Sequence, residues 1–168
     1  MSPEYLPIVD RDGNVTGREL RSVCHNGISM LLHPVVHLHI VNDAGELYLQ
    51  KRPMHKDIQP GKWDTSVGGH VDPGETILEA LAREVMEEVG LGLADQEHIA
   101  TYLWESAMER ELVHSYIMRT EKSPKPDKEE VDEGRFWRME EIQDRLGRGV
   151  FTPNFEYEFG KFIRLSDL

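Results

Sequence analysis

Residues 69–91 read GHVDPGETILEALAREVMEEVGL, and this stretch decides the fold. Between Ile77 and Val89 the apolar residues recur at the spacing of one helical face. Gly90 follows directly, at a position where helix C-caps favour glycine. The pattern therefore predicts a helix over 77–89, the clearest helix in the chain.

This helix carries a concentrated set of acidic side chains, because Glu84, Glu87 and Glu88 stand at positions i, i+3 and i+4. Like charges at this spacing destabilise an isolated helix, so the crowding indicates a compensating cation. Glu75 adds a carboxylate before the helix, and Arg83 is placed to hold the neighbouring glutamates in one geometry. Carboxylate oxygens suit hard divalent ions. The pattern favours a site for Mg²⁺ or Mn²⁺ over a merely solvated acidic face.

Strand patterns surround the acidic helix on both sides. Asp12-Gly13, between apolar pairs at 8–9 and 15–16, predicts a hairpin, and 120–134 reads as a surface loop. Strands are predicted at 35–41, 46–52, 99–104, 112–118 and 135–139, and shorter helices at 18–25, 140–146 and 154–164. Because strands and helices do not alternate regularly, the pattern predicts an α/β fold with a mixed sheet. We expect one domain over 1–168, with the hairpin and a short helix in 1–33.

Composition limits the partners of this domain. The 168 residues are 39% hydrophobic and 30% charged, which is typical of one globular domain. A net charge of −12 repels nucleic acids and anionic membranes, so a phosphate ligand needs local cations, for which Arg52 and Lys62 are the candidates. The single Cys24 excludes an internal disulfide, and no long apolar run opens the chain. We expect a cytoplasmic protein, and a homodimer stays open.

The stretch 69–91 resembles the Nudix box, G-x5-E-x7-R-E-U-x-E-E-x-G-U with U aliphatic, and every fixed position matches. The resemblance implies an α/β/α sandwich around a mixed sheet, in which the box forms a loop-helix-loop. It further implies that the metal is held by carboxylates of the box and by the backbone carbonyl of Gly69, with Arg83 orienting the glutamates. The residues expected to act in catalysis are Arg83, Glu84, Glu87 and Glu88.

Further segments resemble one branch of the Nudix superfamily, the isopentenyl diphosphate isomerases and their hydrolase-like relatives. The resemblance rests on LYLQKR at 47–52 and PGKWD at 60–64. The isomerases carry a cysteine where this chain has Gly68, and a tryptophan where it has Asn154. Gly68 cannot move a proton, and Asn154 offers no aromatic face to a cationic intermediate. Two isomerase groups are therefore absent.

Histidines leave a second metal site open. His33 and His70 align with histidine ligands of the isomerases, and Glu109 and Glu111 are similar to their paired acids. His25 lies one position away from the remaining histidine. By contrast, we interpret His37 and His39, which share one sheet face, as packing or hydrogen-bonding residues, and Trp63 and Trp104 as core residues.

Together these features predict a Mg²⁺- or Mn²⁺-dependent hydrolase. Its substrate would be a nucleoside diphosphate derivative or a related small organic diphosphate, cleaved by in-line attack of water on phosphorus. Glu84 is the preferred general base, with Glu109 and Glu111 as alternatives. Two other functions stay open, an isomerase of prenyl diphosphates and a catalytically silent diphosphate-binding module.

Overall fold

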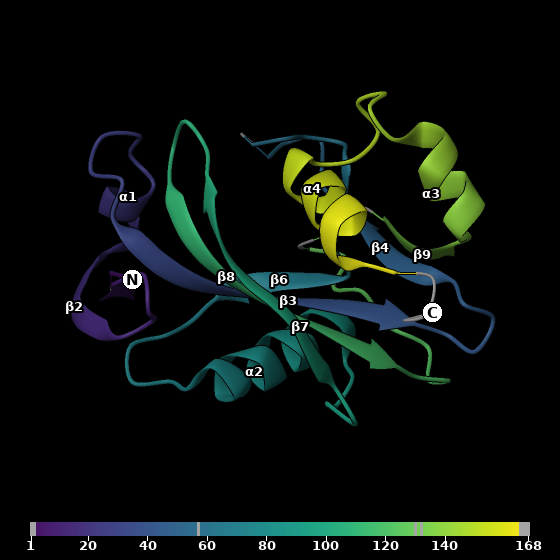
Figure 1. Ribbon diagram of the computed structural model, residues 1–168, viewed down its shortest axis with the longest axis horizontal. Coiled ribbons are helices and arrows are strands. Elements are labelled where there is room, and N and C mark those ends of the chain that lie inside the picture. The colour runs from purple at the N-terminus through teal and green to yellow at the C-terminus, as the bar shows by residue number, and fades with distance from the viewer. Residues whose placement is uncertain (1–2, 57, 130, 132, 165–168) are drawn as a thin grey trace.

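A computed structural model describes residues 3–56, 58–129, 131 and 133–164. Strands and helices follow one another irregularly along the chain (Figure 1). The strands are β1 (Tyr5–Val9), β2 (Val15–Leu20), β3 (Leu32–Val41), β4 (Leu47–Lys51), β5 (Trp63–Asp64), β6 (Val67–His70), β7 (Glu97–Glu105), β8 (Arg110–Arg119) and β9 (Glu133–Trp137). The helices are α1 (Arg21–Cys24), α2 (Ile77–Val89), α3 (Met139–Arg145) and α4 (Pro153–Phe162).

The large sheet is organised around β3. Along its whole length β3 pairs in parallel with β8, which pairs antiparallel with β7. The other side of β3 pairs with two strands in succession, first with β6 over Val35–Leu38 and then with β4 at Val41. Both β5 and β9 pair with β4. The sheet is therefore mixed, and β4 and β6 share the same side of β3, joined by hydrogen bonds from Ser66 to Tyr48 and from Gln50 to Ser66.

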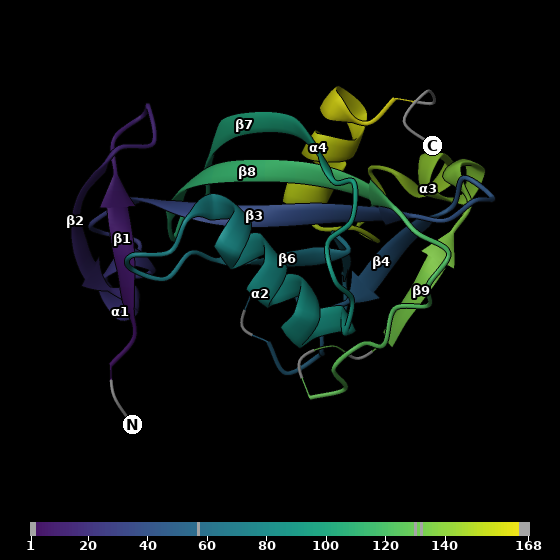
Figure 2. The same ribbon diagram turned by 90° about the horizontal axis from the view of Figure 1, so that it is seen from below.

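Helices cover both faces of this sheet. Figures 1 and 2 show α2 on one side and α4 on the other, with the β1–β2 hairpin and α1 at one end of the sheet. The side chains of Leu81 and Val85 on α2 pack against a buried row from β3 that includes Leu38. On the opposite face, Phe155 and Phe159 of α4 pack in a second core cluster, with Leu47, Leu49, Trp137, Ile142 and Phe151. The expected α/β/α sandwich around a mixed sheet is confirmed.

Local signals at both ends of α2 explain why the prediction over 77–89 is confirmed. Thr76 and Glu79 form a capping box, in which each side chain accepts a hydrogen bond from the backbone N–H of the other residue. Gly90 ends the helix with a φ of 68°, in the left-handed region that favours glycine. The helix that carries the box carboxylates is thus bounded by its own sequence.

Several predicted elements are wrong in their extent. The strand expected over 35–41 is β3, which begins at Leu32, and the loop expected over 120–134 ends earlier because β9 begins at Glu133 and pairs with β4. The helix expected over 18–25 is reduced to α1, because residues up to Leu20 belong to β2 and pair with β1. The strand expected over 135–139 is β9, which ends at Trp137, because the backbone N–H of Arg138 donates to Glu141 and α3 begins. The hairpin is confirmed, with Gly13 at a φ of 88°.

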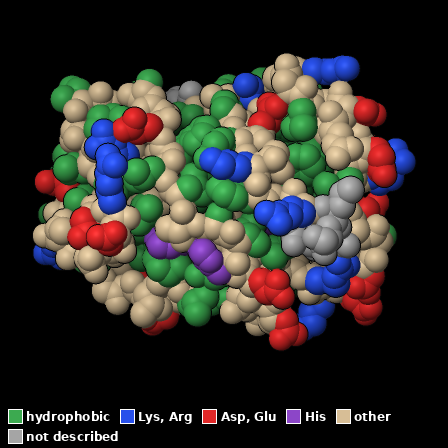
Figure 3. All heavy atoms as spheres, viewed as in Figure 1, with side chains coloured by type: hydrophobic (Ala, Val, Ile, Leu, Met, Phe, Trp, Pro, Cys, Tyr) green, Lys and Arg blue, Asp and Glu red, His purple; other side chains and the backbone are tan. Residues whose placement is uncertain are grey.

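Charge is spread over the surface. Figure 3 shows acidic and basic side chains interspersed with hydrophobic ones on one face, so the negative net charge does not form a single acidic field there. Within the part of the chain that the structure describes, no helix combines the length and hydrophobicity that a membrane crossing requires.

Candidate functional site

A cleft of about 1020 Å³ is bordered by β3, β4 and β6. Its lining includes Gln50 of β4, Gly68 of β6 and His37 of β3, together with residues of α2 and of the β7–β8 hairpin. The charged side chains that line it are Glu4, Arg21, Arg52, Lys56, Asp64, Asp72, Arg83, Glu84, Glu87, Glu88, Glu109, Glu111 and Asp127. Glu84, Glu87 and Glu88, which were predicted to share one helix face, therefore all line one cleft.

Arg83 donates hydrogen bonds to three carboxylates of the box. Its Nε and Nη2 donate to the two oxygens of Glu75 at 2.7 and 3.0 Å, and its Nη1 donates to Glu84 at 2.9 Å and to Glu87 at 3.4 Å. Hydrogen bonds from Arg83 lower the pKa of Glu75. Nη2 also donates to the backbone carbonyl of His70 at 3.0 Å. One guanidinium thus fixes the carboxylates relative to each other and to the end of β6.

Glu84 and Glu88 are crowded together. Burial raises the pKa of Glu84, and burial together with the charge of Glu84 raises the pKa of Glu88 well above its usual range. One oxygen of Glu88 is buried and has no hydrogen-bond partner among the described residues. Gly69 lies against Glu84 so closely that a Cβ at this position would overlap the carboxylate. These residues fit a divalent cation, which would neutralise the carboxylates that the fold holds together.

A second group of side chains with the chemistry of metal ligands lies beside the carboxylates. His25, His33, His70 and Glu109 each offer a ligand atom, and these four atoms lie within 4.8 Å of one another. His25, His70 and Glu109 line the cleft, whereas His33 is fully buried behind it. The Nε2 atoms of His25 and His33 lie 2.5 and 3.4 Å from Oε2 of Glu109. The sequence left this site open with His33, His70 and Glu109, and the structure brings those three together.

Hydrogen bonds and burial determine the orientation and charge of these side chains. Nδ1 of His33 donates to the carbonyl oxygen of Leu31 at 3.0 Å, so Nε2 is the ring nitrogen that faces the cluster. Burial lowers the pKa of His33, but the hydrogen bonds to Glu109 and Leu31 raise it above its usual value. Burial and the neighbouring positive groups lower the pKa of His70 to about 3, so its imidazole is neutral. Nε2 of His25, Nε2 of His33 and Oε2 of Glu109 are buried and lie against one another, and despite burial the two histidines lower the pKa of Glu109 to about 2. Imidazole nitrogens with a carboxylate suit a first-row transition ion.

His25 completes the group, although in the sequence it lies one position away from the expected histidine. It follows α1 directly, and the turn after it is fixed by Asn26, whose Oδ1 accepts from the backbone N–H groups of Ile28 and Ser29. Spacing along the chain is a poor guide across such a loop. Glu111 lines the cleft without joining the group, and burial together with nearby Glu109 raises its pKa to about 7.

The expected phosphate-binding cations are separated by the structure. Arg52 lines the cleft, where its Nε donates to the carbonyl of Ile58 at 2.9 Å and its Nη1 lies 3.6 Å from Asp64. Lys62 is absent from the cleft lining among the described residues, whereas Arg21 and Lys56 are part of it. The sequence missed these two because the cleft is assembled from segments that are distant in the chain.

The two tryptophans also differ from each other. Trp63 packs edge-on against Trp137, with ring centroids 5.1 Å apart, which agrees with the predicted core role. Trp104 was expected in the core, but it lines the cleft and contacts the ring of Tyr157 at a centroid distance of 5.2 Å. Because β7 borders the cleft at this point, Trp104 presents an aromatic surface to it.

Comparisons with known proteins agree with this geometry. A family model described as NUDIX domain matches residues 31–155. An isopentenyl-diphosphate Delta-isomerase of Streptomyces griseus is 30% identical over 156 residues, covering 89% of this chain and 79% of the relative. An uncharacterized Nudix hydrolase of Listeria monocytogenes is 35% identical over 130 residues, covering 74% of each chain.

Solved structures agree at the level of the fold. The crystal structure of DR0079 from Deinococcus radiodurans superposes with a TM-score of 0.80 at 24% identity, covering 96% of this chain and all (100%) of that one. The MutT protein of Methanosarcina mazei has a TM-score of 0.67 at 26% identity, covering 78% of this chain and 92% of that one. The resemblance to the fold of DR0079 therefore extends over nearly the whole chain.

Proposed function

The chain belongs to the Nudix family and is a Nudix hydrolase, and we propose that it hydrolyses, with Mg²⁺ or Mn²⁺, a diphosphate linkage in a nucleoside diphosphate derivative or a related small organic diphosphate. One observation carries this proposal. The carboxylates that Arg83 holds together face a cleft large enough for a small diphosphate, and Arg52 lies in the same lining.

In this proposal Glu84, Glu87 and Glu88, with the carbonyl of Gly69, hold the divalent ion. When bound, the ion supplies positive charge opposite the phosphate oxygens and makes water more acidic. Arg83 keeps Glu84 in place through its 2.9 Å hydrogen bond. These residues therefore organise the charge that hydrolysis of a diphosphate needs.

A carboxylate of the cleft accepts the proton of the attacking water. Glu84 is our candidate, and the raised pKa that burial gives it supports this role. Glu111, with its pKa of about 7, is the alternative best matched to neutral pH. Glu109 is the third candidate, but its proximity to His25 and His33 suits it better to binding a cation. Arg52 binds the phosphate, because its side chain lines the cleft. Lys62 has no such role, because it is absent from the lining among the described residues.

We further propose that His25, His33, His70 and Glu109 hold a second divalent ion, of a kind that accepts imidazole ligands, such as Mn²⁺. The support is the convergence of four ligand atoms within 4.8 Å. We also propose that the chain acts as one domain in a reducing, cytoplasmic setting, since Cys24 is a buried free thiol. A homodimer is compatible with these proposals.

A second candidate function is isomerisation of a prenyl diphosphate. The convergence of the histidines favours it, as does the 30% identity to a relative named isopentenyl-diphosphate Delta-isomerase. Against it stand Gly68, which has no group to move a carbon-bound proton, and Asn154, whose Nδ2 donates to Tyr102 at 2.9 Å. We therefore place hydrolysis first.

The experiment that tests this proposal is a panel of nucleoside diphosphate derivatives and small organic diphosphates, incubated with the protein and Mg²⁺ or Mn²⁺. Products are identified by mass spectrometry, and H₂¹⁸O shows which phosphorus water attacks. Glu88→Gln serves as the matched inactive variant. Metal-dependent cleavage by the wild type alone supports the hydrolase, whereas equal product with both proteins refutes it.

A further inference from the structure

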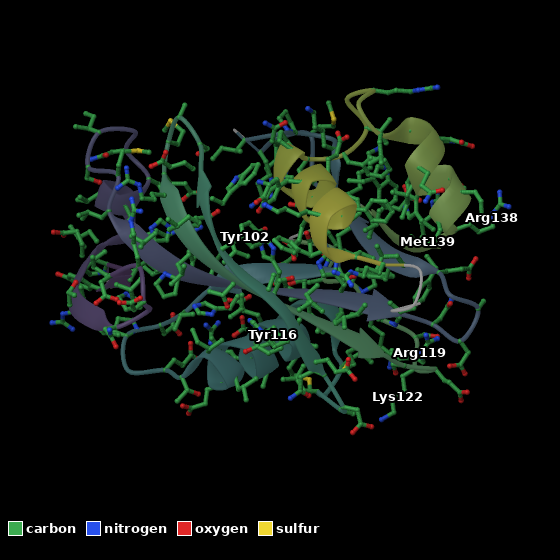
Figure 4. The ribbon with its side chains drawn as sticks, viewed as in Figure 1. Tyr102, Tyr116, Arg119, Lys122, Arg138 and Met139 are labelled. Atoms are coloured by element: carbon green, nitrogen blue, oxygen red, sulfur yellow. The ribbon has the colours of Figure 1, made fainter. Side chains whose placement is uncertain are left out.

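Glu158 of α4 is a fully buried carboxylate that is turned towards the sheet. One oxygen, Oε2, accepts hydrogen bonds from Nδ1 of His37 at 2.8 Å and from the hydroxyl of Tyr102 at 2.6 Å. The other oxygen, Oε1, accepts from Nε2 of His39 at 2.8 Å and from the hydroxyl of Ser115. The hydrogen-bonding role predicted for the two histidines is confirmed. Figure 4 labels Tyr102, which reaches this network from β7.

His37 is the histidine of this network that lines the cleft. Its side chain is 12% exposed, whereas the side chain of His39 is completely buried. A Cβ added to Gly68 would lie 3.4 Å from Cδ2 and 3.7 Å from Nε2 of His37. Because Glu158 takes Nδ1, the Cδ2–Nε2 side of the ring is the one that faces Gly68 and the cleft.

Glu158 also determines the charge of His37. Burial alone would lower the pKa of His37, but the carboxylate of Glu158, assisted by Asp64 and Glu111, raises it to about 9. Burial alone would raise the pKa of Glu158, but His37 and His39 hold it well below its usual range. Near neutral pH the pair is therefore an imidazolium and a carboxylate, and Nε2 of His37 carries a hydrogen.

We propose that His37 binds an oxyanion of the substrate, with its Nε2–H donating a hydrogen bond to a phosphoryl oxygen, and that Glu158 is the positioning residue that fixes the ring. The inference rests on the proposed function, because the oxyanion is a phosphoryl oxygen of the diphosphate proposed above. A fixed cation at this point of the cleft favours an anionic ligand, whereas most of the other charged side chains that line the cleft are acidic.

Gly68 has a defined part in this arrangement. Its lack of a side chain leaves the Nε2 side of His37 open to a ligand that lies along β6. A hydrogen bond from a charged donor to a phosphoryl oxygen is short and strong, and here the donor is held in place before the ligand arrives. His37 thus determines specificity for a substrate with an oxyanion at this position.

The test measures binding of methylenediphosphonate, a diphosphate analogue that resists hydrolysis because carbon replaces the bridging oxygen. Calorimetry is done with Mg²⁺ near neutral pH. We expect His37→Gln to weaken binding about 10-fold or more, the usual effect of losing a hydrogen bond to a charged group. His39→Gln is the matched control, because it removes a 2.8 Å bond to the same carboxylate from a fully buried position. We expect this control to change binding by less than about 3-fold. Equal weakening by both variants, or by neither, overturns the proposal.

A measurement on the wild type keeps the test decisive if His37→Gln does not fold. In the ¹⁵N-labelled protein, methylenediphosphonate should shift the Nε2 resonance of His37 and leave the ring resonances of His39 in place. An unshifted His37 resonance at saturation overturns the proposal. Hydrolysis of the diphosphate panel is measured in a separate experiment. Cleavage with unchanged binding by His37→Gln overturns the oxyanion site alone, whereas His37-dependent binding without cleavage overturns the proposed reaction and supports the site.

Discussion

Replacing His37 by glutamine should change how the stability of the protein depends on pH. In the folded protein the pKa of His37 is raised from 6.5 to about 9, chiefly by Glu158 acting against the effect of burial. At about 1.4 kcal/mol for each pKa unit, the difference corresponds to about 3 kcal/mol of stabilisation. Because the folded pKa is the higher one, this stabilisation is complete below about pH 6.5 and is lost as the pH rises through about 9.

The assay is urea unfolding, followed by circular dichroism at several values between about pH 6 and pH 9.5. The wild type should be more stable than His37→Gln at the acid end of this range, and the difference in unfolding free energy should shrink by about 3 kcal/mol towards the alkaline end. Titrating groups that do not contact His37 are shared by both proteins, so their contribution cancels in the difference. Glu158 does contact His37, but in the variant it keeps hydrogen bonds from His39, Tyr102 and Ser115, which favour its charged form. His55→Gln, at an exposed position outside the network, should run parallel to the wild type. A constant difference between wild type and His37→Gln would refute the charged pair.

The remaining predictions concern the two candidate metal sites and the reaction. Glu88→Gln should lower turnover about 100-fold while the circular dichroism spectrum stays unchanged, because it removes a metal ligand and relieves crowding; near-wild-type turnover would contradict the site. Gly69→Ala should also abolish most turnover, since its Cβ displaces the carboxylate of Glu84, whereas the Cβ of Gly68→Ala meets only an ordinary contact at 3.4 Å and should leave Mn²⁺ binding intact in calorimetry. Mn²⁺ should raise the melting temperature of the wild type with the logarithm of its concentration, and less so for His33→Gln; equal shifts would exclude His33 as a ligand. The unmodified protein should take up no deuterium from heavy water into isopentenyl diphosphate, and catalytic uptake seen by mass spectrometry would overturn hydrolysis as the first assignment.

The box could be predicted from the sequence because everything that defines it is local. The helix follows from apolar spacing between Ile77 and Val89, and its limits follow from the capping box at Thr76 and from Gly90. The carboxylates share a face through helical geometry alone, so three of them could be placed together without knowing the rest of the fold.

Contacts between distant segments could not be predicted in the same way. Glu158 lies 121 residues after His37, and no periodicity of β3 indicates which helix will supply a partner for its histidines. His25 lies one position away from the expected histidine in the sequence, because the loop before β3 determines where its side chain lies. The helix predicted over 18–25 is too long, because the pairing of β2 with β1 overrides local helix propensity. In each case the position of the residue depends on contacts between distant segments, which the local sequence pattern does not show.

The adjacent glycines of β6, Gly68 and Gly69, each leave room for a different side chain of the cleft. Successive residues of a strand point to opposite faces, so Gly69 lies against Glu84 of α2 while Gly68 lies against His37 on the α4 side. A side chain at 69 would displace a carboxylate of the box, whereas one at 68 would cover the imidazole. With glycine at position 68 the space in front of Nε2 of His37 stays open, whereas a larger side chain there would occupy it. Position 68 of this chain therefore has no group that could transfer a proton to carbon, and in our proposal its open space receives a phosphoryl oxygen beside a fixed hydrogen-bond donor.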